Sequence, residues 1–310
     1  MNHYAEIEHL LESGAHFGHL TRRWNPKMEK YIFGERNGIH IIDLRKTQIL
    51  IDLARNAVND AASRGKIVLF VGTKTQAQEV VKEHAKRCGS NYVTERWLGG
   101  MLTNFSTIRK SIKRLASIDK MEVDGTFEKI TKKEKLMLSR ERDRLRKVFG
   151  GIEEMTRLPG AIFVVDIKKE HIAVKEAKIL DIPVIAMVDT NCDPEDADFP
   201  IPANDDSIKT IEIVTKILAD AVLEGSELAK MRHAELSSES ERVTRESEAG
   251  SEDKPKVQRR MRERRTGRGG QKTQRGDKPR TTEAKEPTEI VEEQTSSETT
   301  VETTQESIES

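Results

Sequence analysis

Aromatic side chains are scarce in this sequence: only 4% of its 310 residues are Phe, Tyr or Trp, and the last of them is Phe199. Large apolar residues are equally rare after about Ser237, where Ser, Thr, Glu and Arg dominate. A segment that buries little apolar surface cannot offset the entropy it loses on ordering. We therefore predict a disordered tail over 231–310 and a folded part large enough for one α/β domain, with or without an insertion.

Cysteine and long apolar runs are also nearly absent. The two cysteines, Cys88 and Cys192, form no Cys-x-x-Cys pair, which favours a reduced compartment over a disulfide framework. The stretch 1–14 is polar and lacks the apolar core of a signal peptide, and no apolar run reaches the roughly 18 residues of a membrane span. The sequence predicts a cytoplasmic protein that does not enter a membrane.

The signatures of common catalytic and nucleotide sites are missing. The segment "VLFVGTKTQAQEV" has neither a Gly-x-Gly-x-x-Gly nor a Walker pattern, and no serine lies in a nucleophile elbow. One enzyme alternative stays open: the turn from Gly72 to Thr75 could hold a nucleotide or sugar phosphate, with Asp166 and Asp189 at two strand ends as an acid–base or metal pair. Strand-end aspartates more commonly cap the following turn. We predict no catalytic residues and no cofactor.

Two histidines, His16 and His19, stand three residues apart in "SGAHFGHL". They could supply two zinc ligands, but no Cys pair lies nearby, so further ligands would have to come from elsewhere in the chain. They are therefore weak metal candidates. The alternative is that they form hydrogen bonds within their loop or meet a partner.

Charge is balanced in total, with 53 basic and 53 acidic residues, but it is segregated along the chain. Twelve Lys and Arg against two acidic residues fall in 254–280, and nine Glu against one Lys follow in 281–310. The part 266–280 resembles a disordered Arg/Gly segment that binds RNA by neutralising phosphates. A tail whose acidic end pairs loosely with its own basic stretch is the alternative.

Apolar β-branched runs alternate with helical periodicity in the remaining sequence. Strands are predicted at 39–44, 66–72, 92–93, 161–166 and 182–189, and helices at about 46–63, 75–88, 169–180 and 206–230. Because these strands are apolar throughout, both faces of the sheet should be covered. The predicted fold is α/β, a doubly wound, mostly parallel sheet of the flavodoxin or Rossmann type, built from 1–104 and 158–230.

Residues 105–157 interrupt that alternation with helical periodicity and no strand. Ile108 and Ile112 belong to an apolar stripe on a first helix, and Leu145 and Ile152 to a stripe on a second. This pattern predicts an inserted antiparallel helical hairpin, a coiled coil. Its solvent faces carry many Lys and Arg, which suits an RNA or protein partner better than an active site.

Two loops combine cations, aromatic rings and glycines: "LTRRWNPKMEKYIFGERNGIH" and "TERWLGGMLTNFSTIRK". Guanidinium groups bind phosphate and stack on bases, aromatic rings stack, and Asn and Thr contact sugars or base edges. The alternative is that Trp24 and Trp97 are core residues with exposed arginine neighbours. The RNA-binding candidates come from these two loops, from the start of the predicted hairpin and from the turn at Gly72–Thr75. They are Arg22, Arg23, Trp24, Asn25, Lys27, Lys74, Arg96, Trp97, Gly99, Gly100, Thr103, Asn104, Arg109, Lys110 and Lys113.

Four long motifs resemble one known family. They are "LLESGAHFGHLTRRWNPKMEKYIFGERNGIHIIDLRKT", "ERWLGGMLTNFSTIRKSI", "PGAIFVVDIKKEHIAVKEAKILDIPVIAMVDTNCDP" and "IPANDDSIKTI". In this order, over about residues 5–230, they are similar to the bacterial ribosomal protein family known as small-subunit protein two. The tail departs from the shorter family pattern.

The resemblance implies an α/β domain with a coiled-coil insertion and no enzymatic activity. It implies a place on the solvent side of the small ribosomal subunit, between head and body, in contact with small-subunit rRNA. It also implies a late step in assembly and retention of the large small-subunit protein one, which captures mRNA. The expected partners are thus rRNA and neighbouring ribosomal proteins, with RNA contact assigned to the two loops and the hairpin.

Overall fold

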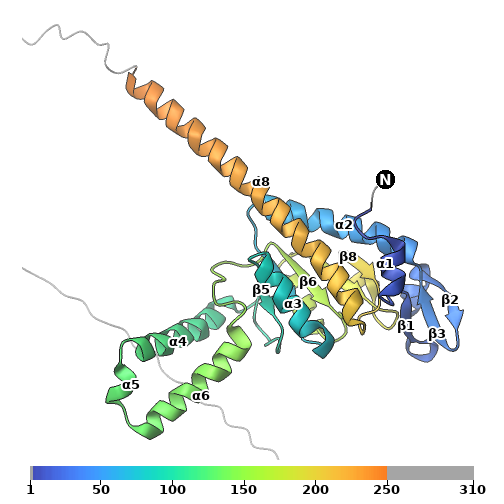
Figure 1. Ribbon diagram of the computed structural model, residues 1–310, viewed down its shortest axis with the longest axis horizontal. Coiled ribbons are helices and arrows are strands. Elements are labelled where there is room, and N and C mark those ends of the chain that lie inside the picture. The colour runs from blue at the N-terminus through green and yellow to red at the C-terminus, as the bar shows by residue number, and fades with distance from the viewer. Residues whose placement is uncertain (1–2, 250–310) are drawn as a thin grey trace, which may run out of the picture. The chain divides into compact units, whose positions relative to one another are not determined.

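The computed structural model describes residues 3–249, with side chains as far as 235 (Figure 1). The helices are α1 (Ile7–Glu12), α2 (Leu44–Ser63), α3 (Thr75–Arg87), α4 (Phe105–Val123), α5 (Thr126–Lys129), α6 (Lys132–Phe149), α7 (His171–Ile179) and α8 (Ile208–Ala249), with 3₁₀ helices η1 (Thr21–Arg23), η2 (Pro26–Tyr31) and η3 (Pro194–Asp196). The strands are β1 (Phe17–Leu20), β2 (Ile32–Arg36), β3 (Ile39–Ile42), β4 (Val68–Val71), β5 (Asn91–Val93), β6 (Ala161–Val165), β7 (Val184–Val188) and β8 (Phe199–Pro202). None of the helices within 3–249 is both long and apolar enough to cross a membrane.

The main sheet has five parallel strands in the order β5-β4-β6-β7-β8. Every residue of β4, β6 and β7 is buried, because helices cover both faces of the sheet. This confirms the doubly wound α/β prediction. The edge strand β8 carries Pro200 and Pro202, whose missing N–H groups are tolerated at an edge.

Successive residues of each central strand enter opposite halves of the core. Phe70 and Phe163 meet edge to face, 5.7 Å apart, in the half covered by α2, α3 and α8. Leu69 and Ile162 enter the other half, which holds α7 and the loop after β5. This second half also receives apolar residues from both ends of the 105–157 segment, so the insertion is anchored in the core.

Helices α4 and α6 run in opposite directions and are joined by α5 (Figure 1). Their ends return to the sheet, where Tyr92 donates its backbone N–H to the carbonyl of Gly151 at 2.9 Å. A Cβ on Gly151 would lie 2.1 Å from the Tyr92 carbonyl oxygen, so this approach requires glycine. A coiled-coil geometry, and the division into an α/β domain of 1–104 and 158–230 with 105–157 as a separate insertion, stay predictions.

The predicted strand at 39–44 does not join the parallel sheet. It is β3, the centre of a separate three-stranded antiparallel sheet of order β1-β3-β2. Asn37 and Gly38, with φ of 52° and 74°, form the tight β2–β3 turn. An Asn-Gly pair between apolar runs is a strong hairpin signal, and the expectation of a simple loop before residue 39 overlooked it.

The last helix is longer than predicted. Helix α8 was expected to end near Lys230, with a disordered tail from 231, but it continues to Ala249. The correction therefore concerns 231–249. The remaining tail, with its basic block 254–280 and acidic block 281–310, lies outside the described residues.

Candidate functional site

The first candidate loop presents two exposed arginines. Arg22 and Arg23 lie on η1, a single 3₁₀ turn between β1 and η2. Within the described residues neither guanidinium makes a hydrogen bond or an ion pair, so both are free to take an anionic partner. Guanidinium groups bind phosphate well, so contact of these two arginines with RNA stays a prediction.

The other candidates in this loop hold it in place. Asn25 caps η2, its side-chain oxygen accepting from the Lys27 backbone N–H at 2.9 Å. Lys27 pairs with Asp193 at 2.8 Å and Glu195 at 2.5 Å, and bonds with these carboxylates raise its pKa. Trp24 is half-buried, its ring centroid 5.0 Å from that of His40. Thus Asn25 and Lys27 make contacts within the protein, and their contact with RNA stays a prediction.

The second loop, 95–104, is built around a residue that sequence analysis missed. Glu176 of α7 is buried, and its carboxylate accepts five hydrogen bonds from this loop. The donors are the Trp97 indole Nε1 at 3.1 Å, the backbone N–H of Gly100 at 2.7 Å, that of Leu102 at 2.9 Å, and the backbone N–H and Oγ1 of Thr103 at 3.0 and 3.1 Å. Burial by itself raises the pKa of this carboxyl, but the bonds outweigh burial and lower it.

Three RNA candidates therefore have polar groups that are bonded within the protein. Trp97 is only 6% exposed and packs in the core, so its ring is no stacking platform for bases. The polar groups of Gly100 and Thr103 are bonded to Glu176. The signal for Glu176 was weak, because a charged residue on a helix is usually solvated; only its neighbours, Ala173 and Ala177, hint at a buried face.

The outward side of this loop retains the other candidates. Arg96, Gly99 and Asn104 are all exposed, and Arg96 forms no ion pair with any of the described residues. At the start of α4, Arg109 donates to the carbonyl of Thr156 at 3.0 Å. Lys110 and Lys113 are exposed on the next turn of that helix.

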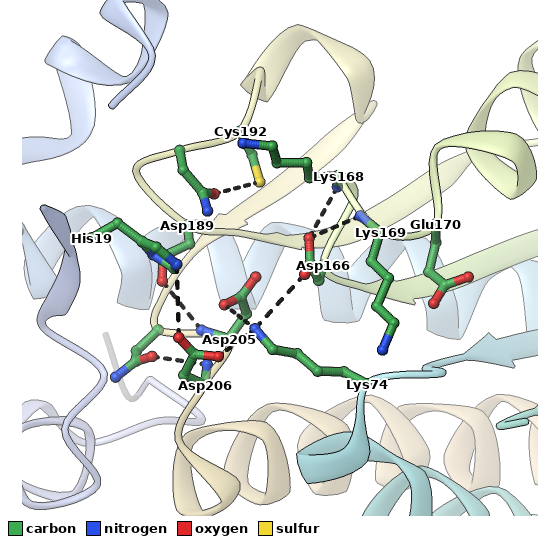
Figure 2. Close-up of polar contacts among 12 residues, drawn as sticks. His19, Lys74, Asp166, Lys168, Lys169, Glu170, Asp189, Cys192, Asp205 and Asp206 are labelled. Atoms are coloured by element: carbon green, nitrogen blue, oxygen red, sulfur yellow. Dashed lines mark hydrogen bonds and ion pairs between the residues drawn. The ribbon is translucent and has the colours of Figure 1, made fainter. Parts of the chain in front are cut away.

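A cluster of charged side chains lies where the strands of the parallel sheet end (Figure 2). Its lysine is Lys74, whose Nζ lies 2.8 Å from Asp205, 2.6 Å from Asp206 and 3.7 Å from Asp166. Burial lowers the pKa of Lys74, but bonds with Asp205 and Asp206 outweigh it and raise the pKa overall. Lys74 is thus the counter-ion of a mostly buried acidic cluster, and its contact with RNA stays a prediction.

Asp205 is the most confined of these carboxyl groups. Its side chain is 1% exposed, and burial together with Asp189 and Asp166 raises its pKa to about 7. Asp189 is equally buried and caps its own turn, accepting from the Thr190 backbone N–H at 2.5 Å. Asp166, at φ 67°, caps the next turn by accepting from the N–H groups of Lys168 and Lys169.

The two histidines are not a ligand pair. His19 approaches the acidic cluster, with Nδ1 3.2 Å from Asp189 and Nε2 3.7 Å from Asp206, and its bond with Asp189 raises its pKa against the opposing effect of burial. His16 instead stacks on Phe17, 4.0 Å between centroids. Among the described residues, the groups with cation-binding geometry are His19–Asp205–Asp206 and Asp166–Cys192–Asp205, each with its ligand atoms within 4.8 Å. A metal at His19 stays a prediction, and His16 belongs to neither group.

The enzyme alternative does not suit this geometry. The backbone N–H and Oγ1 of Thr73, in the turn that was to hold a phosphate, both donate to the buried carboxyl of Glu170. Burial raises the pKa of Glu170. Because the acidic cluster lies on the same side, its carboxylates would repel a phosphate bound at this turn. Asp166 and Asp189, the proposed acid–base or metal pair, instead cap turns.

The sequence matches the family model "Ribosomal protein S2" over residues 10–225. It is 64% identical over 225 residues to the small ribosomal subunit protein uS2 of Chloroherpeton thalassium, an alignment covering 73% of this chain and 90% of that protein. The protein of that name from Chlorobaculum parvum is 56% identical over 248 residues, covering 80% and 98%. That from Salinibacter ruber is 56% identical over 234 residues, covering 76% and 73%. The chain therefore belongs to the ribosomal protein S2 family, and it is a structural, non-enzymatic component of the small ribosomal subunit in the cytoplasm.

Proposed function

We propose that this protein binds small-subunit rRNA between the head and body of the subunit through the outer faces of its two loops and its hairpin. The observation that carries the proposal is the exposed pair Arg22 and Arg23, which have no partner within the described residues. The neighbouring cation Lys27 is neutralised by two carboxylates. Arg22 and Arg23 therefore keep an exposed positive charge, and guanidinium groups are well suited to bind phosphate.

The second loop supports the same proposal in a different way. Glu176 holds the loop in one conformation before any partner arrives, which reduces the ordering entropy that binding would cost. Arg96, Gly99 and Asn104 are the outward residues on this fixed loop. We assign the contact with rRNA to them rather than to Trp97.

We further propose that the protein joins the subunit late and helps retain the large mRNA-capturing small-subunit protein one. This follows from the family resemblance and from the loops that carry it. Depleting the protein should then lower the amount of protein one on small subunits while leaving most other proteins in place.

Cosedimentation tests the central proposal. The full-length protein, mixed with small subunits that lack it, should sediment with them in moderate salt, and retention should fall steeply with salt because phosphate contacts release counterions. Protein that stayed in the free fraction, while other added subunit proteins sedimented, would contradict rRNA binding. A thermal-shift screen with nucleotides and sugar phosphates distinguishes this proposal from the enzyme alternative. If the protein were such an enzyme, one of these ligands would raise its melting temperature in a saturable way.

A further inference from the structure

The hairpin carries a surplus of positive charge that its own acidic residues do not neutralise. Residues 105–157 contain fifteen Lys and Arg against nine Asp and Glu. Many exposed ion pairs contribute little to stability, but they decide which cations have a partner nearby. The distribution of these pairs therefore shows which face of the hairpin keeps its charge.

One face of α6 is neutralised by α4. Arg146 pairs with Asp119 at 2.7 Å, and Arg142, one turn earlier on the same face, pairs with Glu122. We call Arg142 and Arg146 the paired row. Residues four apart share a helix face, so both cations point to the α4 side of the hairpin.

A second face of α6 has no such neutralisation. Lys133, Met137, Arg140 and Arg144 follow one another at spacings of four, three and four residues, which places them along one face; we call them the open row. All four are exposed, Met137 by 63%. Among the described residues no ion pair involves Lys133, Arg140 or Arg144. From Lys133 to Arg144 the row extends about 16 Å along the helix.

The open row borders a shallow hollow of about 600 Å³. Arg114 of α4 lies across it and holds Glu141 with two bonds of 3.1 Å. Arg144 helps Arg114 to lower the pKa of this carboxyl, but it forms no ion pair with it. The remaining acid of the lining, Glu134, lies in the first turn of α6, where the helix dipole favours a negative side chain. Lys110 lies one turn before Arg114 on the same face of α4 and adds a further exposed cation.

Aromatic side chains are not available on the hairpin for stacking on unpaired bases. Its three aromatic residues are Phe105, which is half-buried, Phe127, which is 5% exposed, and Phe149, which is 4% exposed. Recognition of single-stranded RNA depends on such stacking, whereas double-stranded RNA is recognised through its shape and its phosphates. Long cationic side chains at helical spacing suit the second mode.

We propose that the open row, together with Lys110, binds the sugar–phosphate backbone of duplex RNA. The inference rests on the proposed function and names the surface and the form of RNA for one of its contacts. Binding of this kind is independent of sequence, and each phosphate contact adds about one unit to the dependence of binding on the logarithm of salt concentration.

The test compares full-length variants, so that the tail contributes equally to each. Retention on small subunits is measured over a range of salt for the wild type, for Arg140→Ala/Arg144→Ala, and for the matched control Arg142→Ala/Arg146→Ala, which removes two cations from the same helix. The open-row variant should lower the salt slope by about two, one for each phosphate that the variant no longer binds. The control should keep the wild-type slope, and circular dichroism of the free proteins shows whether the hairpin is still helical.

A charge-preserving variant, Arg140→Lys/Arg144→Lys, should retain most of the binding and the slope, because lysine also binds phosphate as a point charge. If the open-row Ala variant kept the wild-type slope, or if the open-row and paired-row Ala variants weakened binding equally while both stayed helical, the inference would be wrong. A wild-type protein that failed to sediment with subunits would instead refute the proposed function.

The class of partner is read directly from a photo-crosslinker attached at Met137→Cys. The native thiols do not compete, because Cys88 and Cys192 are buried. We expect crosslinks to rRNA within a helical segment. Crosslinks to a ribosomal protein, or to unpaired nucleotides, would overturn the assignment to duplex RNA.

Discussion

Glu176 accepts a hydrogen bond from the indole nitrogen of Trp97 at 3.1 Å, although the two residues lie 79 positions apart in the chain. Four further bonds from Gly100, Leu102 and Thr103 complete the set around this carboxylate. A buried charge with this many donors holds the loop and α7 together. It thereby fixes the positions of the loop's outward residues.

Replacing Glu176 with Gln should lower the free energy of unfolding by about 3 kcal/mol, because a charged acceptor is removed and an amide N–H₂ faces several donors. Urea unfolding measures this change. Because the pKa of Glu176 is lowered in the folded protein, its contribution is present above the usual value of 4.5 and disappears as pH falls below it. As the pH falls below 4.5, the free energy of unfolding should therefore decrease less for the variant than for the wild type. The exposed Glu153→Gln is the control, and an equal, small effect of both would contradict the prediction.

Arg22→Ala/Arg23→Ala should weaken retention on small subunits without changing the melting temperature of the free protein. Both side chains are exposed and make no bond within the described residues, so folding does not depend on them. Removing two phosphate-binding groups should lower the salt slope by about two. The exposed pair Arg36→Ala/Arg45→Ala serves as the comparison in the same sedimentation assay; a fall in melting temperature for Arg22→Ala/Arg23→Ala would assign the arginines to the fold instead.

Lys74→Met should destabilise the protein by about 3 kcal/mol, because the buried Asp205 loses its cation and must then take up a proton. The double variant Lys74→Met/Asp205→Asn should recover part of that stability, since a neutral amide then replaces the carboxyl that lost its cation. A double-mutant cycle by urea unfolding gives the coupling between the two sites. Additive effects would show that the pair is not coupled.

His84 should make stability depend on pH near neutrality. It is buried between α3 and α8, its Nδ1 has no partner among the described residues, and burial, aided by Arg87 and opposed by Glu83, Glu212 and Asp220, lowers its pKa below 6.5. The unfolded chain then binds a proton more readily, so the contribution is complete above pH 6.5 and disappears as pH falls below it. Unfolding from about pH 7.5 to 5 should show a smaller decline for His84→Gln than for the wild type. Parallel curves would contradict this.

Gly225→Ala should be destabilising by about 1–3 kcal/mol, although alanine favours helices. Helix α8 crosses α2 closely here, and a Cβ at this position would lie 2.7 Å from the Cβ of Ala62 and 2.7 Å from the carbonyl oxygen of Asn59. The exposed neighbour Glu227→Ala, two positions later, controls for a general effect on the helix. Thermal unfolding of both variants measures the difference, and a more stable Gly225→Ala protein would show that the crossing can relax.

Much of the fold could be predicted from local sequence. The strands β4, β6 and β7 and the helices between them were identified because a strand buried on both faces is apolar throughout. The small antiparallel sheet was missed, although Asn37 and Gly38 marked its turn, because β1 and β2 are short and only partly apolar. The predicted end of helix α8 came too early because 231–249 contains few large apolar residues.

The sequence by itself determined the parallel sheet and the family, because both depend on runs of neighbouring residues. It also identified Arg22 and Arg23 as RNA-binding candidates, because the loop that carries them could be predicted from neighbouring residues alone. Only the tertiary structure decided which polar residues face inward. Trp97 meets Glu176, and Lys74 meets Asp205, 131 positions away, through chain crossovers. Whether a charged side chain reaches solvent or a buried partner depends on these long-range contacts, and no local pattern encodes them.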